Sequence, residues 1–371
     1  MSNPLFSSCP LRGLTLDNRI IISPMCQYSA RSGSATDWHL IHLGALALSG
    51  AGMMFIEATA VEPEGRITSG CLGLYSDDNE AALGRVIQAL RRYADVPIGI
   101  QLAHSGRKGS SYAPWDGGQL QPVTDGGWQP VAPSPQPQLE GEAAPMELDI
   151  AGIARIREAF AASAQRAARL GFDALELHCA HGYLLHEFLS PLSNKRDDRY
   201  GGSLENRMRL PLEIFDAVRA VWPAERPMGV RVSATDWVED GWDLEQTVVL
   251  CRRLKQLGCD WIDASSGGVS PRQKIPLAPG YQVPFSRRIR DDVGIATIAV
   301  GLITDPKHAD EIIANGDADF VALARGILWD LRWPWRAAAV LGCQVRAPKQ
   351  YWRAPPRGCE DVFKDVVFGA R

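Results

Sequence analysis

The chain has 371 residues, of which 46% are hydrophobic and 22% charged, and its formal net charge is −4. These values are ordinary for a globular protein, and without a basic run nothing indicates a nucleic-acid or membrane-surface partner. No apolar segment reaches the roughly 18 residues that span a bilayer, and the N-terminus lacks the layout of a signal peptide. The eight cysteines form no C-x-x-C pair, so we expect free thiols in a reducing compartment, the cytoplasm, rather than a zinc or iron–sulfur site.

Short apolar runs rich in Ile, Val, Leu and Met alternate with helix-like segments, as in a parallel sheet whose strands are buried on both faces. The predicted strands are Arg19–Pro24, Met53–Glu57, Pro97–Leu102, Ala174–His178, Met228–Val232, Trp261–Ala264, Ala296–Val300 and Phe320–Leu323. Eight strand–helix units predict a single α/β domain over residues 1–371, a (β/α)8 TIM barrel. A doubly wound sheet is the alternative that periodicity alone leaves open.

Residues 110–145 follow the third predicted strand and break this alternation. The segment is crowded with Gly, Pro, Gln and Trp and has no sustained period, which is typical of an excursion from the fold. Its place after a barrel strand puts it over the active-site mouth, where it would act as a lid. A tolerated surface insertion is an equally open interpretation.

The clearest helix is predicted from Asp149 to Leu170. Asp149 is an N-cap candidate and Gly171 a stop signal. Between them an apolar stripe is formed by Ile150, Ile153, Ile156 and Phe160.

His178, His181 and Tyr183 stand at the carboxyl end of the fourth predicted strand, before a polar loop. Parallel α/β barrels build their active sites at that end of the strands. Two imidazoles and a phenol supply hydrogen bonds and protons, so we predict that this stretch is catalytic. The spacing of the two histidines predicts no metal, because a catalytic zinc needs a third ligand and Glu187 and Asp197 are no better than chance candidates.

The ends of the last two strands predict a phosphate-bearing cofactor. They read Ala-Val-Gly301 and Leu-Ala324-Arg325-Gly, at the position where barrels commonly hold a phosphate. Gly301 lets the backbone approach closely, and Arg325 offers a bidentate fork. The chain has no G-x-G-x-x-G, Walker A or G-x-S-x-G motif, so a Rossmann site, ATP chemistry and a serine nucleophile are unsupported.

Residues 343–371 form a C-terminal arm in which Tyr351, Trp352 and Arg353 lie among prolines. Such a tail is either a frayed end or an arm that docks on a neighbouring subunit.

Several segments together resemble the old yellow enzymes, the FMN-dependent ene-reductases, and most closely their thermophilic-like and xenobiotic reductase branch. The matching segments are NRIIISPMCQYS, IEATAVEPEGRIT, IGIQLAHSGRK, LELHCAHGYLLHEFLSPLSNKRDDRYGGSLENR, VRVSATD, DASSGG, PGYQVPFSRRIR, AVGLIT, ALARG and QYWR. They run in the family's order from about Leu5 to Arg353, nearly the whole chain. Each alone is weak, but the set is highly specific.

The resemblance implies bound FMN, with NADPH or NADH as hydride donor. The matching cofactor positions are Ser23, Pro24, Met25 and Cys26 against the flavin, Ala58 and Gln101 at its ring, Arg231 near its N1 and O2 edge, and Gly301, Ala324 and Arg325 around the phosphate. The matching substrate positions are His178 and His181 at the carbonyl oxygen, Tyr28 in the pocket wall and Tyr183 as proton donor. Cys26 would tune the flavin potential; a buried small hydrophobe is its other interpretation.

The implied activity is that of an NADPH dehydrogenase that reduces an activated C=C bond in enones, enals, maleimides or nitro compounds. FMN N5 would deliver the hydride and Tyr183 the proton. A multidomain dienoyl-CoA reductase is disfavoured because its cysteine cluster and second nucleotide-binding domain have no match in this sequence; a non-catalytic flavin sensor stays open. Arg353 matches an arginine that reaches the neighbour's active site, and Trp352 is the other candidate for that contact. Both imply a homodimer or homotetramer with exchanged arms.

Overall fold

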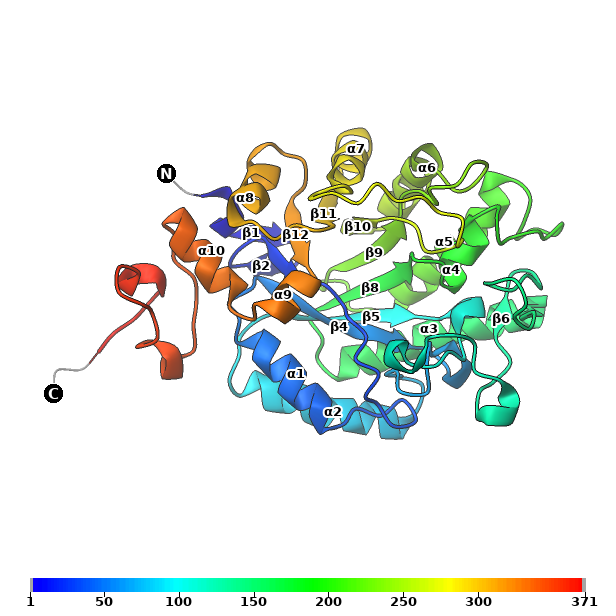
Figure 1. Ribbon diagram of the computed structural model, residues 1–371, viewed down its shortest axis with the longest axis horizontal. Helices are drawn as coiled ribbons and strands as arrows, with labels where there is room; N and C mark the ends of the chain where they lie inside the picture. Colours follow the sequence, from blue (N-terminus) through cyan, green and yellow to red (C-terminus); the bar gives the residue numbers. More distant parts are fainter. Residues whose placement is uncertain (1–2, 369–371) are drawn as a thin grey trace.

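The computed structural model describes residues 3–368, in which eight parallel strands close into a barrel (Figure 1). In chain order the barrel strands are β3 (Ile20–Ile22), β4 (Met53–Ala60), β5 (Ile98–Ala103), β8 (Ala174–Cys179), β9 (Met228–Ser233), β10 (Trp261–Ser265), β11 (Ala296–Val300) and β12 (Phe320–Leu323). Successive strands are neighbours, and β12 pairs with β3 to close the barrel. The predicted (β/α)8 barrel is confirmed, and the doubly wound sheet is excluded.

Helices surround the barrel and follow the strands in turn. They are α1 (Asp37–Ala47), α2 (Asp77–Arg91), α3 (Ile150–Arg169), α5 (Leu204–Val221), α6 (Leu244–Gln256), α7 (Val283–Val293), α8 (Pro306–Ala314) and α10 (Trp333–Leu341). The short helices α4 (Leu184–Leu189) and α9 (Arg325–Trp329) follow β8 and β12 directly. All residues of β4, β5, β8 and β9 are buried, which explains the continuous apolar runs of the sequence.

Helix α3 begins after the predicted N-cap, where the Asp149 side chain accepts a hydrogen bond from Gly152 N–H at 2.7 Å. The predicted apolar stripe is wrong at its first member, because Ile150 is 53% exposed whereas Ile153 and Phe160 are buried. At about 100° per residue, Ile150 points roughly 90° away from the mean direction of the other members of the stripe. The helix therefore packs on the barrel only from Ile153 onward.

An antiparallel hairpin, β1 (Cys9–Leu11) and β2 (Leu14–Leu16), was not predicted. Leu11 and Leu16 are buried in the apolar cluster that contains Ile21, Phe55 and Trp261 from inside the barrel. The hairpin thus closes the amino end of the barrel. Strands of three residues are too short to show a period, which is why the sequence pattern does not reveal them.

The barrel interior is filled by large rings opposite glycines. A side chain on Gly229 would place its Cβ 2.0 Å from the ring of Trp261, and one on Gly99 would place it 2.4 Å from the ring of Phe55. The two rings lie 5.9 Å apart. This packing fills the barrel interior without a pore.

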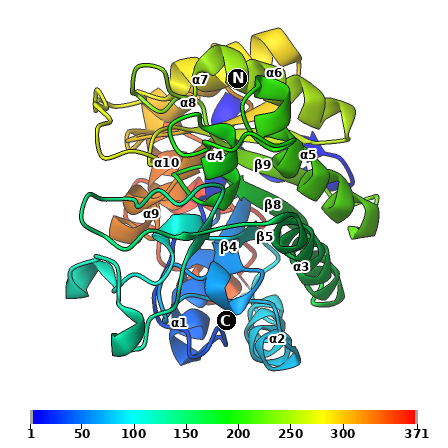
Figure 2. The ribbon, with the colours of Figure 1, turned by 90° about the vertical axis from the view of Figure 1, so that its right-hand side faces the viewer.

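The excursion and the C-terminal arm lie at opposite ends of the molecule (Figure 1). Residues 110–145 contain short 3-10 turns and β6 (Val131–Ala132), which pairs with β7 (Met146–Glu147). In Figure 2, which faces the end that carries α4, the excursion lies beside that helix. The arm packs against α10, and Val345 N–H donates to Val362 O at 2.9 Å.

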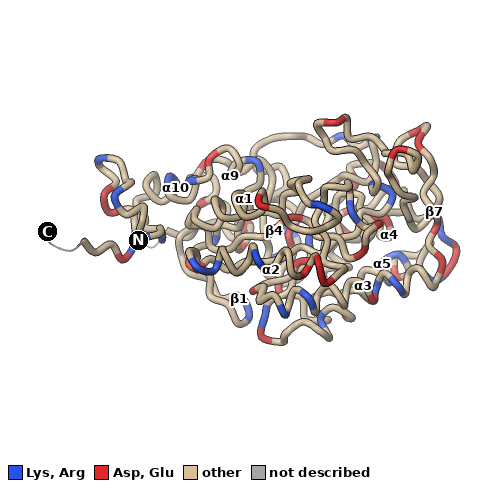
Figure 3. The backbone as a smooth tube through the Cα atoms, turned by 90° about the horizontal axis from the view of Figure 1, so that it is seen from below, with Lys and Arg blue, Asp and Glu red and all other residues tan. Residues whose placement is uncertain are grey.

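Acidic and basic residues are interspersed along the described chain (Figure 3). Within residues 3–368, no helix is long and apolar enough to cross a membrane. The same residues contain no group of three His, Cys, Asp or Glu side chains placed to hold a metal ion.

Candidate active site

Three rings predicted to act together, those of His178, His181 and Tyr183, lie side by side at the carboxyl end of β8. The ring centroids of His178 and His181 are 5.1 Å apart with 78° between the planes. The centroids of His178 and Tyr183 are also 5.1 Å apart, at 62°. His178 comes from the strand itself, and the other two come from the turn that leads into α4.

That turn depends on a close approach of two loops. His181 and Gly182 both have positive φ, 60° and 72°. A Cβ on Gly182 would lie 2.2 Å from the carbonyl oxygen of Gly268, in the loop after β10. A Cβ on Gly268 would lie 2.5 Å from the His181 backbone. Both positions therefore require glycine.

Both imidazoles are neutral in the folded protein. Burial, followed by the charge of Arg231, lowers the pKa of His178 and of His181 well below the ordinary range. Nε2 of His181 lies 2.7 Å from Ser265 Oγ. Nδ1 of His178 is buried and has no hydrogen-bond partner among the described residues. Each ring therefore has one N–H to donate and adds no positive charge to the site.

Tyr183 stays protonated because burial raises the pKa of its phenol well above 10. The Lys108 ammonium lies 4.9 Å from the centre of the Tyr183 ring. It donates to the carbonyl oxygens of His181 at 2.9 Å and Gly268 at 3.3 Å. Burial lowers the pKa of Lys108 to about 8. Lys108 thus ties the two loops together beside the donor cluster.

The segment Ser23, Pro24, Met25 and Cys26 leaves the end of β3 and is anchored at both ends. Ser23 N–H donates to Leu323 O in β12 at 2.9 Å. Beyond the segment, Gln27 N–H donates to Glu57 Oε2 at 3.2 Å. The Ser23 hydroxyl is buried without a hydrogen-bond partner in the described structure.

Cys26 faces a second thiol, that of Cys71. Their hydrogen bond, followed by burial, raises the pKa of Cys26 well above its ordinary value, and the same bond lowers the pKa of Cys71. Cys71 Sγ also accepts from Thr68 N–H at 3.4 Å. Cys26 is therefore a neutral thiol beside that of Cys71.

Strand register brings the ring-side candidates into two neighbouring pairs. A bulge at Glu57 lets Ala58 pair with Gln101, and His178 pairs with Arg231. These residues come from four consecutive strands of the barrel.

Buried carboxylates lie behind the ring-side polar groups. Gln101 Nε2 donates to Glu176 Oε1 at 2.8 Å, and Arg231 Nε lies 3.3 Å from Asp263 Oδ2. Burial raises the pKa of Glu176 to about 8 and also raises that of Asp263. The Gln101 amide is thus held by a carboxyl group inside the barrel.

The predicted phosphate residues lie directly after the neighbouring strands β11 and β12. Gly301 has φ +126°, and a Cβ there would lie 3.0 Å from the Tyr281 ring and from Gln282 Nε2. Arg325 is exposed, next to the half-buried Ala324, and makes no ion pair with the described residues. Its guanidinium is free to take an anion.

The other residues predicted to contact the substrate do not lie together in the structure. Tyr28 lies near the excursion, with its ring 5.5 Å from that of Trp115. Trp352 instead lines a groove of about 620 Å³ with Asn18 and Pro97, which precede barrel strands. Trp352 and its neighbour Arg353 therefore lie at the amino end of their own barrel, away from His178.

Four contacts of the site were not predicted from the sequence: Lys108 on Tyr183, Cys71 on Cys26, Ser265 on His181 and Glu176 on Gln101. Lys108 and Ser265 fall inside segments quoted for the resemblance, which was the available signal. Glu176 also falls inside such a segment, LELHCAHGYLLHEFLSPLSNKRDDRYGGSLENR, whereas nothing local marks Cys71, because its partner comes from another loop.

The closed barrel and the donor cluster at its carboxyl end define a (β/α)8-barrel enzyme. The sequence profile of the NADH:flavin oxidoreductase / NADH oxidase family matches residues 4–342. The chain is 45% identical over 355 residues to an NADPH dehydrogenase of Geobacillus thermodenitrificans, covering 95% of this chain and 99% of the relative. It is 40% identical to an NADH:flavin oxidoreductase of Gibberella zeae, covering 96% and 91% of the two chains.

Solved structures agree with these sequence relatives. Morphinone reductase superposes with a TM-score of 0.75 at 28% identity, covering 99% of this chain and 95% of the other. A 2-naphthoyl-CoA reductase shares the fold with a TM-score of 0.82 at 21% identity, and only 53% of that longer chain is covered.

The chain therefore belongs to the NADH:flavin oxidoreductase / NADH oxidase family, the old yellow enzymes that its motifs resemble. It is an oxidoreductase with FMN as cofactor and a reduced nicotinamide nucleotide as electron donor.

Proposed function

We propose that this chain is an NAD(P)H-dependent ene-reductase that reduces the activated C=C bond of α,β-unsaturated carbonyl or nitro compounds. One observation carries the proposal: two neutral imidazoles and a protonated tyrosine lie together, with 5.1 Å from the ring centroid of the buried His178 to those of the half-buried His181 and Tyr183. Such donors suit a substrate that becomes more negative at one oxygen and needs a proton at carbon.

The polar groups of the site suit FMN. Ser23 Oγ is buried without a hydrogen-bond partner among the described residues, and buried polar atoms of this kind are uncommon in folded proteins; Arg231 Nε has only the ion-pair contact with Asp263 at 3.3 Å. The positively charged Arg231 suits the electron-rich edge of a reduced ring, and the free Arg325 suits a phosphate. The residues we propose to hold FMN are Ser23, Pro24, Met25, Cys26, Ala58, Gln101, Arg231, Gly301, Ala324 and Arg325. FMN, when bound, supplies the hydride chemistry.

The chain's own part in the reaction begins with the carbonyl oxygen. His178 and His181 donate hydrogen bonds to it, and these bonds strengthen as negative charge develops on that oxygen. A single such donor in a dry site is worth roughly 3 kcal/mol. Because both rings are neutral, they bind the carbonyl without first losing a proton.

Tyr183 delivers the proton to the α-carbon. Its high pKa keeps the phenol protonated through the neutral range, so the donor is present at every turnover. The neighbouring Lys108 ammonium favours the phenolate that remains after transfer.

Tyr28 would line the pocket, and residues 110–145 would act as its lid, since Trp115 of that excursion contacts Tyr28. Trp352 or Arg353 would complete the site of a neighbouring subunit, because Trp352 lines the groove at the amino end of its own barrel and Arg353 follows it in the chain. This arrangement requires a homodimer, or a homotetramer of such dimers, with exchanged arms. We propose enones, enals, maleimides and nitro compounds as substrates and the cytoplasm as location.

An anaerobic absorbance trace of the purified protein tests the proposal: NADPH is added first, then 2-cyclohexenone. A yellow protein that bleaches and regains its colour with the enone supports the ene-reductase. A protein that bleaches and stays bleached, although FMN is bound, contradicts it and favours the flavin sensor.

A further inference from the structure

The turn that carries the donors is held by side chains from three directions. His181 N–H donates to Ser233 Oγ at 2.9 Å, and the His181 carbonyl accepts from Lys108 at 2.9 Å. Gly182 N–H donates to Nδ1 of His186 at 2.9 Å. These side chains add to the turn's own backbone hydrogen bond, from Tyr183 N–H to Ala180 O at 3.2 Å, in setting its orientation.

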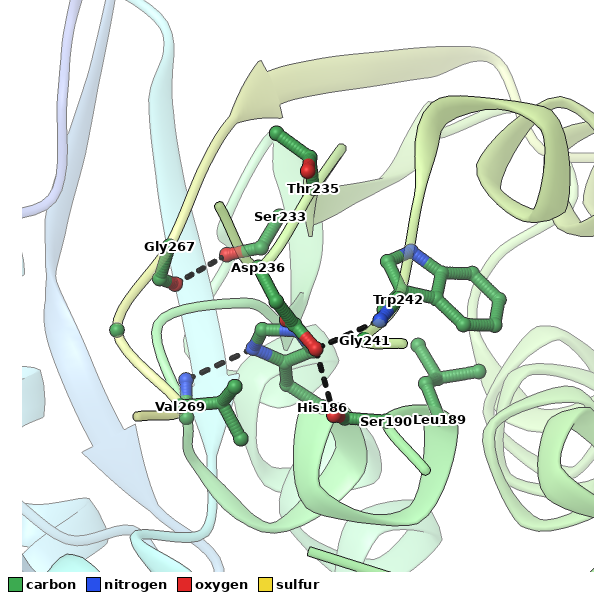
Figure 4. Close-up of polar contacts among 12 residues, drawn as sticks. His186, Leu189, Ser190, Ser233, Thr235, Asp236, Gly241, Trp242, Gly267 and Val269 are labelled. Carbon is green, nitrogen blue, oxygen red and sulfur yellow. Dashed lines mark hydrogen bonds and ion pairs between the residues drawn. The ribbon is translucent and has the colours of Figure 1, made fainter. Parts of the chain in front are cut away.

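His186 belongs to a polar cluster buried behind the turn (Figure 4). Its Nε2 lies 2.9 Å from Asp236 Oδ1, and both side chains are fully buried. The other oxygen of Asp236 accepts from Ser190 Oγ at 2.6 Å and from Trp242 N–H at 2.7 Å. Neither His186 Nε2 nor Asp236 Oδ1 makes a hydrogen bond among the described residues, so the two groups are joined by their close ion-pair contact.

The contacts of His186 define its tautomer. Nδ1 accepts the Gly182 N–H, so the ring proton is on Nε2, which faces Asp236. An ionised carboxylate only accepts hydrogen bonds and therefore favours this tautomer. Burial alone would raise the pKa of Asp236, but His186, Ser190 and Trp242 bring that pKa below its ordinary value. Asp236 is thus ionised.

We propose that Asp236 is a positioning residue: it selects the His186 tautomer that holds Gly182, and thereby orients His181 and Tyr183 toward the substrate. The inference rests on the proposed function and adds to it a buried pair that touches no reacting atom. The alternative is that Asp236 and His186 serve stability only.

Three substitutions separate these roles. In Asp236→Asn, the amide oxygen can still accept from Ser190 and Trp242, but its NH₂ then faces His186 and favours a proton on Nδ1, against the Gly182 N–H. His186→Gln places an amide near the Nε2 position and removes the acceptor for Gly182. His186→Asn keeps an oxygen where Nδ1 stood.

Asp260→Asn is a matched control at the other end of β9. Asp260 accepts from Met228 N–H at 2.8 Å and from Arg12 at 2.9 Å. This substitution removes a partly buried carboxylate that contacts the amino end of β9 and lies just before β10, without touching the turn.

The affinity of the FMN-loaded enzyme for cyclohexanone, a carbonyl that it cannot reduce at a C=C bond, is measured by the change in flavin absorbance. We expect Asp236→Asn and His186→Gln to weaken binding about ten-fold or more, a difference of about 1.4 kcal/mol. His186→Asn should bind more tightly than His186→Gln, and Asp260→Asn should bind as the wild type does. If Asp236→Asn does not fold, the comparison of His186→Gln with His186→Asn tests the inference.

The tautomer is read independently of any substrate by NMR of ¹⁵N-histidine-labelled holoenzyme, with the His186 signals assigned by their loss in His186→Asn. A proton on Nδ1 of His186 in the wild type would overturn the inference. So would variants that lose thermal stability but keep wild-type affinity for cyclohexanone. If the wild type itself binds no cyclohexanone and is not reoxidised by cyclohexenone, the proposed function fails. The NMR measurement of the His186 tautomer then remains the test of the contact between Asp236 and His186.

Discussion

The ring of Tyr183 stands edge-on to that of His178, with 5.1 Å between their centroids. The two residues are separated by a tight turn, yet their side chains converge on one point beside β8. A group that binds the substrate's oxygen and a group that protonates its carbon are thus held by one short stretch of chain. Their separate tasks can be tested separately.

Tyr183→Phe keeps the ring and removes only the proton donor. We expect reoxidation of the reduced flavin by 2-cyclohexenone to slow by about 10²–10⁴-fold, the usual contribution of a general acid. Reduction by NADPH should be nearly unchanged, because it needs no proton from Tyr183. Stopped-flow absorbance measures both half-reactions, and equal slowing of the two would remove Tyr183 from its proposed role.

The neutral histidines of the donor cluster predict a dependence of stability on pH. The ordinary histidine pKa is near 6.5, and those of His178 and His181 are lower in the folded protein. Below about pH 6.5 the unfolded chain therefore takes up protons that the folded chain does not, and the free energy of unfolding falls. Above that pH the two histidines have no such effect.

The corresponding test compares melting temperatures of holoenzyme between pH 7 and pH 5. We expect His178→Asn/His181→Asn to flatten the decline, by at most about 1.4 kcal/mol per pH unit for each histidine. His308→Asn on α8 controls for removing a histidine outside the site. An unchanged slope in the double variant would mean that the two rings are protonated when folded.

Arg325→Ala tests the phosphate end of the proposed FMN site. Removal of a charged hydrogen-bond donor costs roughly 1.5–3 kcal/mol, so we expect the apoprotein to bind FMN about 10- to 100-fold more weakly. The control is Arg85→Ala, which removes an exposed arginine of α2 outside the proposed FMN site. Fluorescence quenching of added FMN gives both affinities, and equal values would place the phosphate elsewhere.

Truncation before Gln350 tests the arm. Trp352 and Arg353 lie away from their own donor cluster, so their removal should leave FMN binding intact but raise the KM for 2-cyclohexenone or shift the mass in solution from dimer to monomer. Light scattering and steady-state kinetics measure the two effects. Trp352→Ala and Arg353→Ala then show which side chain acts. If truncation changes neither quantity, the arm serves only its own barrel.

Much of the fold could be predicted because it depends on local pattern. All eight barrel strands were predicted, with differences only at their ends, since strands buried on both faces leave continuous apolar runs. The N-cap of α3, Asp149, could likewise be predicted, because a cap and its helix are adjacent in sequence. Ile150 was misjudged because several apolar residues at helical spacing do not reveal which one lies at the edge of the packed face.

The residues of the candidate site also differ in whether local sequence could predict them. His178, His181 and Tyr183 could be predicted together because one strand and one turn hold all three. The partners that set their state could not: Lys108 on Tyr183 and Asp236 behind His186 join residues from different loops. Their distances depend on barrel closure.

The sequence by itself determined the strand–helix alternation, the donor residues at the end of β8 and the family, since each depends on residues that are close together in the chain. Only the tertiary structure decided the protonation of those donors and the distance of Trp352 from them. Burial removes water from His178 and Tyr183 and shifts their pKa values in opposite directions, and burial is a property of the closed barrel, not of any segment of the chain.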